Sequence, residues 1–368
     1  MTMPFKPARG LSSAHLQSIM ASSGMRRLRM GKSMAALREA STTHILTTAD
    51  GVRLAGLYTP RPANGGDPKA LVILFHGWEG SAESTYLVET AYALWQSGYA
   101  VFRLNFRDHG DTHHLNPGIF HSCRLDEVVA ACQEIQALSP IRPLLLAGYS
   151  LGGNFALRVA LQAPEASIEL SHVVAVSPLI NPVNGLRAIE QAPWFYEYYF
   201  MRKWRKSLRR KQALFPEHNI DDDLLNGNMY QVTDRLVSRY TEYDGAPPYL
   251  DGYSIAGTRL ANLQIDTTLL TAEDDPVIPV EDFDHLSLPD CAQVIRYPHG
   301  GHCGFIHSWR LKSWAVEFLV EHFERVTQSY IQGVSHSDSE PSPQTPEQTS
   351  LAPLPDTTFH SQESSTHE

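Results

Sequence analysis

The stretch Leu144-Leu-Leu-Ala-Gly-Tyr-Ser-Leu-Gly-Gly153 decides the fold of this chain. An apolar run ends in Gly148-Tyr-Ser150-Leu-Gly152, and a helix-compatible run at 154–161 follows at once. This is the G-x-S-x-G pattern in a strand–turn–helix context, where the turn is sharp and the serine stands at its tip. A side chain in place of either glycine would collide with neighbouring backbone. The pattern therefore predicts that Ser150 is a candidate nucleophile, held in strained geometry above the edge of a sheet.

Strands and helices alternate on both sides of this turn. Continuous apolar runs are typical of parallel strands that are covered on both faces, and they lie at 70–75, 100–106, 144–147, 173–176, 268–271 and 293–297. Runs with apolar residues at helical spacing lie at 86–95, 125–138, 154–161 and 309–326. Two further strand-like runs flank Asp50-Gly51, which indicates a hairpin. The alternation predicts an α/β fold with a doubly wound, mostly parallel sheet.

The strand–helix rhythm breaks between about 179 and 261, which contain an aromatic cluster at 194–200 and a basic helix candidate at 201–211. We expect this insertion to form a helical cap that shapes a pocket and excludes water; an elaborated surface subdomain is the alternative. The chain then divides into an N-terminal extension at 1–40, a main domain at 41–332 that contains the cap, and a tail at 333–368. The tail is acidic and rich in Ser, Pro and Thr, and we expect it to be disordered.

Composition limits the class of protein. The chain has 368 residues and a formal net charge of −10, which argues against a nucleic-acid-binding surface. Its four cysteines form no C-x-x-C pair, which fits a reducing compartment. Residues 1–11 contain no apolar segment typical of a signal peptide, and no run approaches the ~20 apolar residues of a membrane span. We expect a cytoplasmic protein of unknown oligomeric state.

A nucleophilic serine needs a base, and the base needs an orienting acid. Serines in this strand–turn–helix setting are followed in the chain first by the acid and then by the histidine. The acid is expected directly after the strand at 268–271, where Asp275 precedes Pro276 and Asp274 is the competitor; both could instead cap a turn. The base is expected before the last helix, where His302 lies between glycines and His299 is the competitor.

An oxyanion formed at Ser150 needs two backbone N–H donors. One is expected from Leu151, the residue after the nucleophile, and the other from the loop His76-Gly-Trp-Glu-Gly-Ser81 after the first parallel strand. Trp78 is assigned as the second donor because it follows the His-Gly pair. This glycine-rich loop lacks the spacing of either phosphate-binding pattern, so a phosphate cradle is a weak alternative.

Two further clusters could carry other functions. The run Asp108-His-Gly-Asp-Thr-His-His114 could be drawn as a metal site, but adjacent histidines share one metal poorly and no zinc motif is present. We therefore expect neither a metal nor a cofactor. The basic segment Arg202–Lys211 could contact an anionic membrane surface weakly, although a solvated face of the cap is the alternative.

Several motifs together resemble one family. They are Pro4-Phe-Lys-Pro7, His15-Leu-Gln-Ser-Ile19, His76-Gly-Trp-Glu-Gly-Ser81, Asn105-Phe-Arg107, Ile119-Phe-His-Ser122, the stretch 148–154, Asp274-Asp-Pro276 and the stretch 300–305. From about Pro4 to Phe323 the chain resembles the YheT-type branch of the α/β-hydrolases, which is related to animal and plant α/β-hydrolase-domain proteins. It departs from the family pattern after Arg107, where it has Asp108-His109-Gly110.

The resemblance implies the α/β-hydrolase fold, a triad of Ser150, Asp275 and His302, and hydrolysis of carboxylic esters. Members of the family are linked to short-chain or lipid-like acyl esters, so a small-molecule ester is the expected substrate. An acyltransferase that uses the same triad, and a binding protein that keeps the fold without catalysis, are the alternatives.

Overall fold

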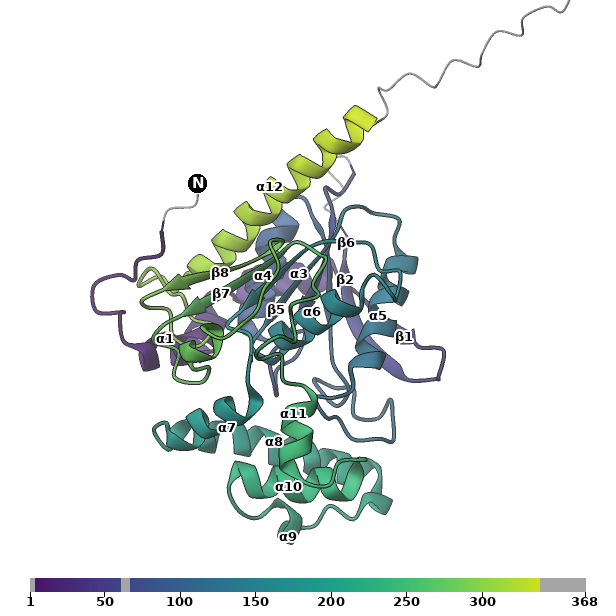
Figure 1. Ribbon diagram of the computed structural model, residues 1–368, viewed down its shortest axis with the longest axis vertical. Helices are drawn as coiled ribbons and strands as arrows, with labels where there is room; N and C mark the ends of the chain where they lie inside the picture. The colour runs from purple at the N-terminus through teal and green to yellow at the C-terminus, as the bar shows by residue number, and fades with distance from the viewer. Residues whose placement is uncertain (1–3, 61–66, 338–368) are drawn as a thin grey trace, which may run out of the picture. The chain divides into compact units, whose positions relative to one another are not determined.

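The computed structural model describes residues 4–60 and 67–337. The chain forms two compact units, Met1–Tyr330 and Ile331–Glu368, and the first contains the whole sheet. The eight strands have the order β1-β2-β4-β3-β5-β6-β7-β8 (Figure 1). Their bounds are β1 Thr42–Thr47, β2 Arg53–Thr59, β3 Leu71–Phe75, β4 Ala100–Leu104, β5 Leu144–Tyr149, β6 Leu170–Val176, β7 Thr267–Ala272 and β8 Ala292–Tyr297.

Strands β3 to β8 are parallel to one another, whereas β1 and β2 form an antiparallel hairpin that joins the sheet through β4. Side chains alternate between two cores along each central strand. Along β3, Leu71, Ile73 and Phe75 pack on one face and Val72 and Leu74 on the other, and all five are fully buried. The prediction of a doubly wound, mostly parallel sheet is confirmed.

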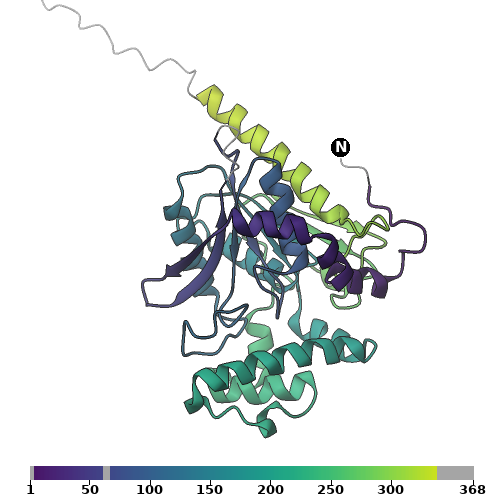
Figure 2. The same cartoon turned by 180° about the vertical axis from the view of Figure 1, so that it is seen from behind.

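Helices cover both faces of this sheet. Helices α5 (Leu125–Leu138) and α6 (Leu151–Gln162) belong to one core, and α4 (Thr85–Gln96) and the start of α12 (Trp314–Ser337) belong to the other. The N-terminal residues add α1 (Ala14–Ala21), α2 (Gly24–Arg29) and α3 (Gly31–Glu39). Figure 2 shows these purple helices in front of the sheet, and Met34 and Leu37 of α3 join the core of α4 and α12.

Five α-helices and one short 3₁₀ helix, Pro216–His218, lie between β6 and β7, within the range in which the sequence indicates an insertion. The α-helices are α7 Pro182–Gln191, α8 Phe195–Leu214, α9 Asp222–Leu225, α10 Met229–Tyr240 and α11 Ala246–Gly252. Figure 1 shows them grouped together, away from the helices that cover the sheet. Local signals explain where two of them begin. Pro182 at the start of α7 follows the N-cap residue Asn181, and Asn228 and Gln231 form a reciprocal capping box at the start of α10. We call α7–α11 the cap.

The closing helix differs from the sequence prediction at both ends. It begins at Trp314 rather than 309, because Ile306 pairs with Ser313 and the Trp314 N–H donates to the Phe305 carbonyl, which turns this stretch back on itself. It continues to Ser337, so residues 333–337 of the expected tail are helical. The rest of that tail, 338–368, lies outside the described residues.

Candidate active site

The turn between β5 and α6 holds Ser150 in a conformation that few residues adopt. Its φ of 55° and ψ of −120° are unfavourable for a residue with a side chain. A Cβ on Gly148 would lie 2.1 Å from the Gly152 carbonyl oxygen, and one on Gly152 would lie 2.4 Å from the His76 carbonyl oxygen. Both glycines are therefore required by close backbone contacts, as the sequence predicts.

Three side chains meet at this turn. The Ser150 Oγ atom lies 3.0 Å from Nε2 of His302, and Nδ1 of the same ring lies 2.9 Å from Oδ2 of Asp275. The other carboxylate oxygen of Asp275 accepts hydrogen bonds from the Val277 and Ile278 N–H groups at 2.8 and 3.0 Å. Because the carboxylate accepts a hydrogen bond from Nδ1–H, the proton of the neutral ring stays on Nδ1, and Nε2 is left to accept the proton of Ser150.

The charge of Asp275 controls the titration of His302. Burial of the ring opposes protonation, but the negative charge of Asp275 and its hydrogen bond, together with the neighbouring Cys303, outweigh burial and raise the pKa of His302 well above its usual value. The Asp275 side chain has no exposed surface, so water screens this interaction little. The pair can stabilise the imidazolium that forms when Ser150 gives up its proton.

The competing residues lie beside the site but do not contact Ser150. Asp274 accepts a hydrogen bond from the Gly301 N–H at 2.8 Å and lies 3.4 Å from Nδ1 of His299. The His299 side chain is 46% exposed. The structure thus brings Asp275 and His302 to the serine, and it gives Asp274 the different task of holding the backbone just before His302.

Two backbone N–H groups are available next to Ser150. Leu151 is the first residue of α6, where amides have no partner within the helix. Trp78 lies in the loop after β3, and this loop runs against the serine, since a Cβ on Gly77 would lie 3.2 Å from the Ser150 Cβ atom. Within residues 4–60 and 67–337, neither amide donates a hydrogen bond to another group. Both residues line the same pocket as Ser150.

Sequence reasoning missed a support for the histidine loop. The His302 N–H donates to Ser18 Oγ of α1 at 2.8 Å. The neighbouring Gln17 side chain is buried, accepts from the Ile306 N–H and donates to the Ile306 carbonyl. The signal was present in the His15-Leu-Gln-Ser-Ile19 motif, to which no role was assigned. The N-terminal residues thus help to position the candidate base.

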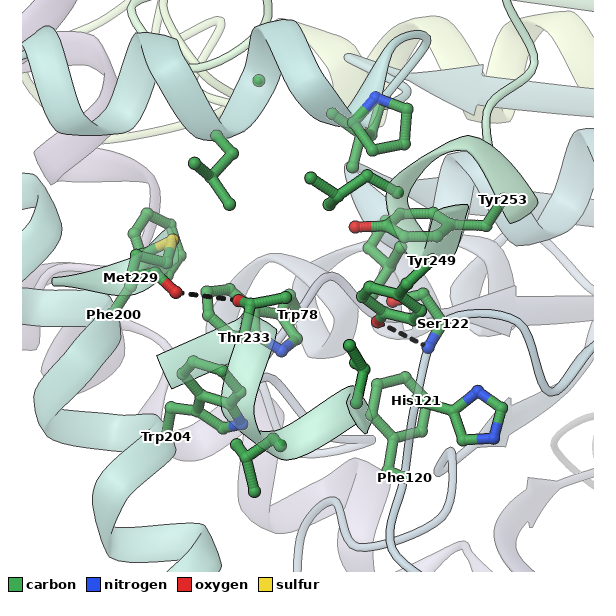
Figure 3. A pocket seen from close by; sticks show the side chains of 18 of the residues that line it. Trp78, Phe120, His121, Ser122, Phe200, Trp204, Met229, Thr233, Tyr249 and Tyr253 are labelled. Atoms are coloured by element: carbon green, nitrogen blue, oxygen red, sulfur yellow. Dashed lines mark hydrogen bonds between the residues drawn. The ribbon is translucent and has the colours of Figure 1, made fainter. Parts of the chain in front are cut away.

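A largely apolar pocket leads from Ser150 into the cap. The empty space between its walls is about 1010 Å³, a volume that includes space open to solvent. In Figure 3, Met229, Phe200 and Trp204 lie on the left of the pocket, and Phe120 and Tyr249 lie on the right. Trp78 lies between them and also lines the pocket. Further wall residues come from α7, α10 and the acid loop: Leu186, Ile189, Leu236, Val237, Val277 and Ile278. Such a lining suits a hydrocarbon chain better than a charged group.

The histidine-rich loop 108–114 is occupied by contacts within the protein. Asp108 forms an ion pair with Lys211, and its other oxygen accepts the Phe120 N–H. His113 Nε2 lies 2.8 Å from Ser207 Oγ, and His109 Nδ1 lies 2.7 Å from the Arg107 carbonyl oxygen. No group of three or more His, Cys, Asp or Glu in the described part of the chain has the geometry of a metal site.

The basic segment of α8 is largely engaged in the protein. Five of its seven basic side chains have partners: Lys203 with the Glu79 carbonyl, Arg205 with Leu225, Arg209 with Asp222, Arg210 with Asp111 and Lys211 with Asp108. Arg202 and Lys206 are exposed and have no hydrogen-bond or ion-pair partner among the described residues. Membrane contact by this segment stays a prediction.

Comparison with known proteins assigns the family. A family model described as "alpha/beta hydrolase fold" matches residues 70–308, which is more than half of the chain. The chain belongs to the α/β-hydrolase family. The match contains Ser150, Asp275 and His302.

Individual relatives are similar at low identity. "Putative esterase YheT" of Escherichia coli (strain K12) is 25% identical over 334 residues, which cover 86% of this chain and 94% of that protein. "Phospholipase ABHD3" of Mus musculus is 23% identical over 277 residues, which cover 68% of this chain and 64% of that protein. These relatives support a hydrolase of the esterase and lipase type.

Solved structures are similar in fold. The crystal structure of "a membrane phospholipase A, a novel bacterial virulence factor" superposes with a TM-score of 0.51 at 17% identity, covering 87% of this chain and 94% of that chain. At this identity the likeness concerns the fold alone. None of the described helices combines the length and the apolar composition that crossing a membrane requires.

Proposed function

We propose that the protein hydrolyses carboxylic esters through an acyl-enzyme on Ser150. The observation that carries this proposal is the hydrogen-bonded series Ser150 Oγ, His302 Nε2, His302 Nδ1 and Asp275 Oδ2, with distances of 3.0 and 2.9 Å. A serine in contact with a base whose other nitrogen is held by a buried carboxylate is the arrangement that nucleophilic acyl transfer needs.

The first half of the reaction acylates the serine. His302 Nε2 accepts the Ser150 proton while Oγ attacks the ester carbonyl carbon, and Asp275 stabilises the imidazolium. The N–H groups of Trp78 and Leu151 donate to the oxyanion that forms. His302 then gives its proton to the leaving alcohol oxygen as the C–O bond breaks.

The second half returns the enzyme to its starting state. His302 accepts a proton from water, and the resulting hydroxide oxygen attacks the acyl carbon. The tetrahedral intermediate collapses with release of the carboxylic acid, and the proton on His302 returns to Ser150. Every proton passes between Ser150, His302, water and the leaving alcohol. The proposed cycle therefore needs no residue outside the site and no cofactor.

The pocket supports esters with an apolar acyl chain. Its walls are largely aromatic and aliphatic from Trp78 to the cap, and Ser150 and Leu151 also line it. A chain bound there would remove apolar surface from water at roughly 25 cal/mol per Å², which favours longer chains until the pocket is filled. Lipid-like acyl esters are therefore the proposed substrate class, and the name of the relative "Phospholipase ABHD3" is consistent with it.

Labelling with a fluorophosphonate probe tests the nucleophile. Wild type should be labelled and should hydrolyse p-nitrophenyl esters in a series from acetate to laurate, and Ser150→Ala should do neither. Ser238→Ala is a matched control, because Ser238 is an exposed serine on α10. A wild type that is folded but neither reacts with the probe nor hydrolyses any ester would reject the proposal in favour of a binding role.

Acceptor alcohols test the acyltransferase alternative on the same triad. If water is the natural acceptor, adding an alcohol should leave the carboxylic acid as the main product. A product mixture dominated by the new ester at low alcohol concentration would replace hydrolysis by acyl transfer, with the assignment of Ser150 unchanged.

A further inference from the structure

Glu79, the residue directly after Trp78, is held at both ends of its backbone. Its N–H donates to Nε2 of His109 at 3.2 Å, and its carbonyl oxygen accepts a hydrogen bond from Lys203 Nζ at 2.6 Å. Its φ of 53° lies in the left-handed region, which is unfavourable for a residue with a side chain. Such a conformation persists only where the surroundings determine it.

We propose that His109 and Lys203 are positioning residues, which clamp the Glu79 backbone and thereby aim the Trp78 N–H at the oxyanion. This inference rests on the proposed function, because an oxyanion forms only if Ser150 attacks a carbonyl. The Trp78 N–H belongs to the Gly77–Trp78 peptide plane, whose carbonyl oxygen lies 2.8 Å from His76 Nδ1 and accepts the Gly80 N–H at 2.9 Å. The bond from the Glu79 N–H to His109 fixes the plane on the other side of the Trp78 Cα atom, between Trp78 and Glu79. The bond to Lys203 fixes the plane after Glu79.

Hydrogen bonding determines the tautomer of His109. Its Nδ1 faces the Arg107 carbonyl oxygen at 2.7 Å, which can only accept, so Nδ1 carries the proton. Its Nε2 is then the acceptor that the Glu79 N–H requires. Burial lowers the pKa of His109 to about 4, so the ring stays neutral and keeps this acceptor at ordinary pH.

A second histidine repeats the arrangement in the opposite direction. His76 lies before Trp78 in the loop after β3, and its Nε2 accepts the Phe106 N–H of the loop after β4 at 3.2 Å. His109 belongs to the loop after β4 and accepts from Glu79 of the loop after β3. The centroids of the His76 and His109 rings lie 4.9 Å apart. Each loop thus supplies a neutral imidazole to a backbone N–H of the other.

Lys203 connects this clamp to the cap. Lys203, Ser207 and Lys211 follow one another at four-residue spacing on α8. Ser207 Oγ donates to the Asp108 carbonyl at 3.3 Å, and Lys211 Nζ donates to Asp108 Oδ1 at 2.7 Å. One stripe of the helix therefore binds the loops after β3 and β4.

The neighbouring stripe of α8 walls the pocket. Its residues Phe200, Trp204 and Leu208 line the pocket. The centroid of the Trp78 ring lies 5.6 Å from that of Phe200 and 5.3 Å from that of Trp204. Trp78 is thus fixed by ring packing on one side and by the clamped Glu79 backbone on the other. One helix shapes the acyl pocket and also holds the proposed oxyanion donor.

An ion pair between Lys203 and the Glu79 carboxylate is the competing explanation of their proximity. Desolvation raises the pKa of Glu79 to about 7 despite the attraction of Lys203. The carboxyl group is therefore only partly charged at neutral pH, whereas the carbonyl oxygen accepts from Lys203 at any pH at which the lysine is protonated. The hydrogen bond to the backbone is the contact that the geometry supports.

The test replaces the lysine and compares the change in kcat with the change in KM. Lys203→Met keeps the aliphatic stem and removes the donor, Lys203→Arg retains a donor, and Lys206→Met is the exposed control on the same helix. The substrate is p-nitrophenyl acetate, whose short acyl group leaves the pocket largely empty. Because loss of one oxyanion donor costs about 100- to 1000-fold in kcat, displacing the donor in Lys203→Met should cost roughly 10- to 100-fold.

Three further readouts accompany this loss. KM should stay within about 2-fold of wild type, because the contact is made in the transition state. The inhibition constant of a trifluoromethyl ketone, which binds as a tetrahedral oxyanion, should rise by the same factor as kcat falls. Lys203→Arg should recover part of the activity, and Lys206→Met should behave as wild type.

The histidine gives an independent test. His109→Leu removes the acceptor, whereas the amide oxygen of His109→Gln can still accept the Glu79 N–H. The leucine variant should lose kcat and the glutamine variant should keep more of it. Because His109 and Lys203 both bind the Glu79 backbone, the fall in kcat of the double variant His109→Leu/Lys203→Met should be smaller than the product of the two single falls. Thermal unfolding checks that each variant is folded.

Several results would overturn the clamp. They are an unchanged kcat in folded Lys203→Met, a rise in KM alone, an equal loss in Lys206→Met, or an unchanged affinity for the trifluoromethyl ketone. An active wild type with these results would reject the clamp and leave the proposed function standing. A wild type that hydrolyses no ester would reject both.

Discussion

The Asp275 carboxylate lies 2.9 Å from Nδ1 of His302, whereas the adjacent carboxylate of Asp274 binds the Gly301 N–H instead. The two acids therefore have separable effects. Asp275→Asn presents an N–H to Nδ1 and favours the wrong tautomer of His302, so kcat should fall by about 10⁴-fold. Asp274→Asn should cost no more than about 10-fold, because it weakens only a support of the loop.

Steady-state kinetics of both variants, with thermal unfolding as a control of folding, check this prediction. Equal losses in the two variants would mean that the acids act together on the loop. A larger loss in Asp274→Asn would transfer the orienting role to Asp274.

The activity should rise with pH in a range set by His302. The ring must be neutral to accept the Ser150 proton, and Asp275 holds the pKa of His302 well above its usual value of 6.5. Activity is therefore low below that raised pKa and increases as the pH passes through it, so the half-maximum of kcat/KM should lie above pH 6.5.

Asp275→Asn removes the charge that raises this pKa, so the remaining activity of that variant should have its half-maximum at lower pH than wild type. The measurement is kcat/KM against pH for wild type, Asp275→Asn and Asp274→Asn. A wild-type inflection below pH 6.5, or an unchanged inflection in Asp275→Asn, would contradict the assignment of the base.

The sequence was sufficient for those parts of the site that depend on local geometry. The sharp turn that presents Ser150 requires glycine at 148 and 152, and the order of acid and histidine follows from the order of the strands. Asp275 could be preferred to Asp274 only by its place before Pro276, because adjacent residues at the end of a strand point in different directions that coordinates alone reveal.

Contacts between distant segments could not be derived from the sequence. Ser18 lies 284 residues before His302, and the His15–Ile19 motif that contains it does not say which distant group it contacts. In the sequence, Lys203 and Lys211 belong to a basic segment that is typical of a solvated helix face. In the structure they donate hydrogen bonds to the loops after β3 and β4. A long flexible side chain can satisfy its charge in water or against a carbonyl, and composition does not distinguish the two.

The cap pocket should set the length of the acyl chain. Thr233 of α10 is buried, lines the pocket and donates its hydroxyl proton to the Met229 carbonyl (Figure 3). Thr233→Phe puts a ring into the space that a chain would occupy, so the preferred p-nitrophenyl ester should become shorter by several carbons while acetate hydrolysis changes by less than about 3-fold.

Ser238→Phe is the matched control, since Ser238 lies on the same helix but is exposed. The chain-length series with both variants checks the prediction. An unchanged optimum in folded Thr233→Phe would mean that the acyl chain leaves Ser150 by another route.

Binding of the basic segment to anionic vesicles should be weak. Only Arg202 and Lys206 of that segment are exposed without a hydrogen-bond or ion-pair partner among the described residues, and each cation near an anionic surface contributes about 1 kcal/mol. The formal net charge of −10 opposes the approach. Sedimentation with vesicles of phosphatidylglycerol should therefore show binding at low salt that is lost at high salt.

The double variant Arg202→Glu/Lys206→Glu should abolish this binding, and its hydrolysis of dissolved p-nitrophenyl acetate should equal that of wild type. Glu substitutions at Arg9 and Arg310 provide a control of equal charge elsewhere in the chain. Equal loss in both double variants would mean that only total charge matters, and no binding by wild type would reject membrane contact by this segment.

The buried histidine pair between β6 and α12 should make the fold sensitive to acid. His172 Nε2 and His322 Nε2 lie 2.9 Å apart, and both side chains are buried near Thr268. Burial lowers the pKa of His172 to about 4, and burial with the neighbouring His172 lowers that of His322 to about 3. In the unfolded chain both rings titrate near the usual value of about 6.5.

The sign of the effect follows from proton uptake. Between about pH 6.5 and 4 the unfolded chain binds protons that the folded chain does not, so the free energy of unfolding falls as the pH falls. His322→Gln keeps a donor and an acceptor but cannot titrate, so it should be less sensitive to acid by an amount on the order of 1–3 kcal/mol across this range. Other buried histidines, including His109 and His121, should leave a residual slope.

Urea unfolding at a series of pH values measures this slope, and His114→Gln is the control because His114 is exposed. The comparison uses the slope against pH rather than stability at one pH, because His322→Gln can also change packing. A slope in His322→Gln equal to that of wild type and of His114→Gln would mean that the pair is protonated in the folded state. The ring-to-ring hydrogen bond would then have to break at a pH at which the protein is still folded.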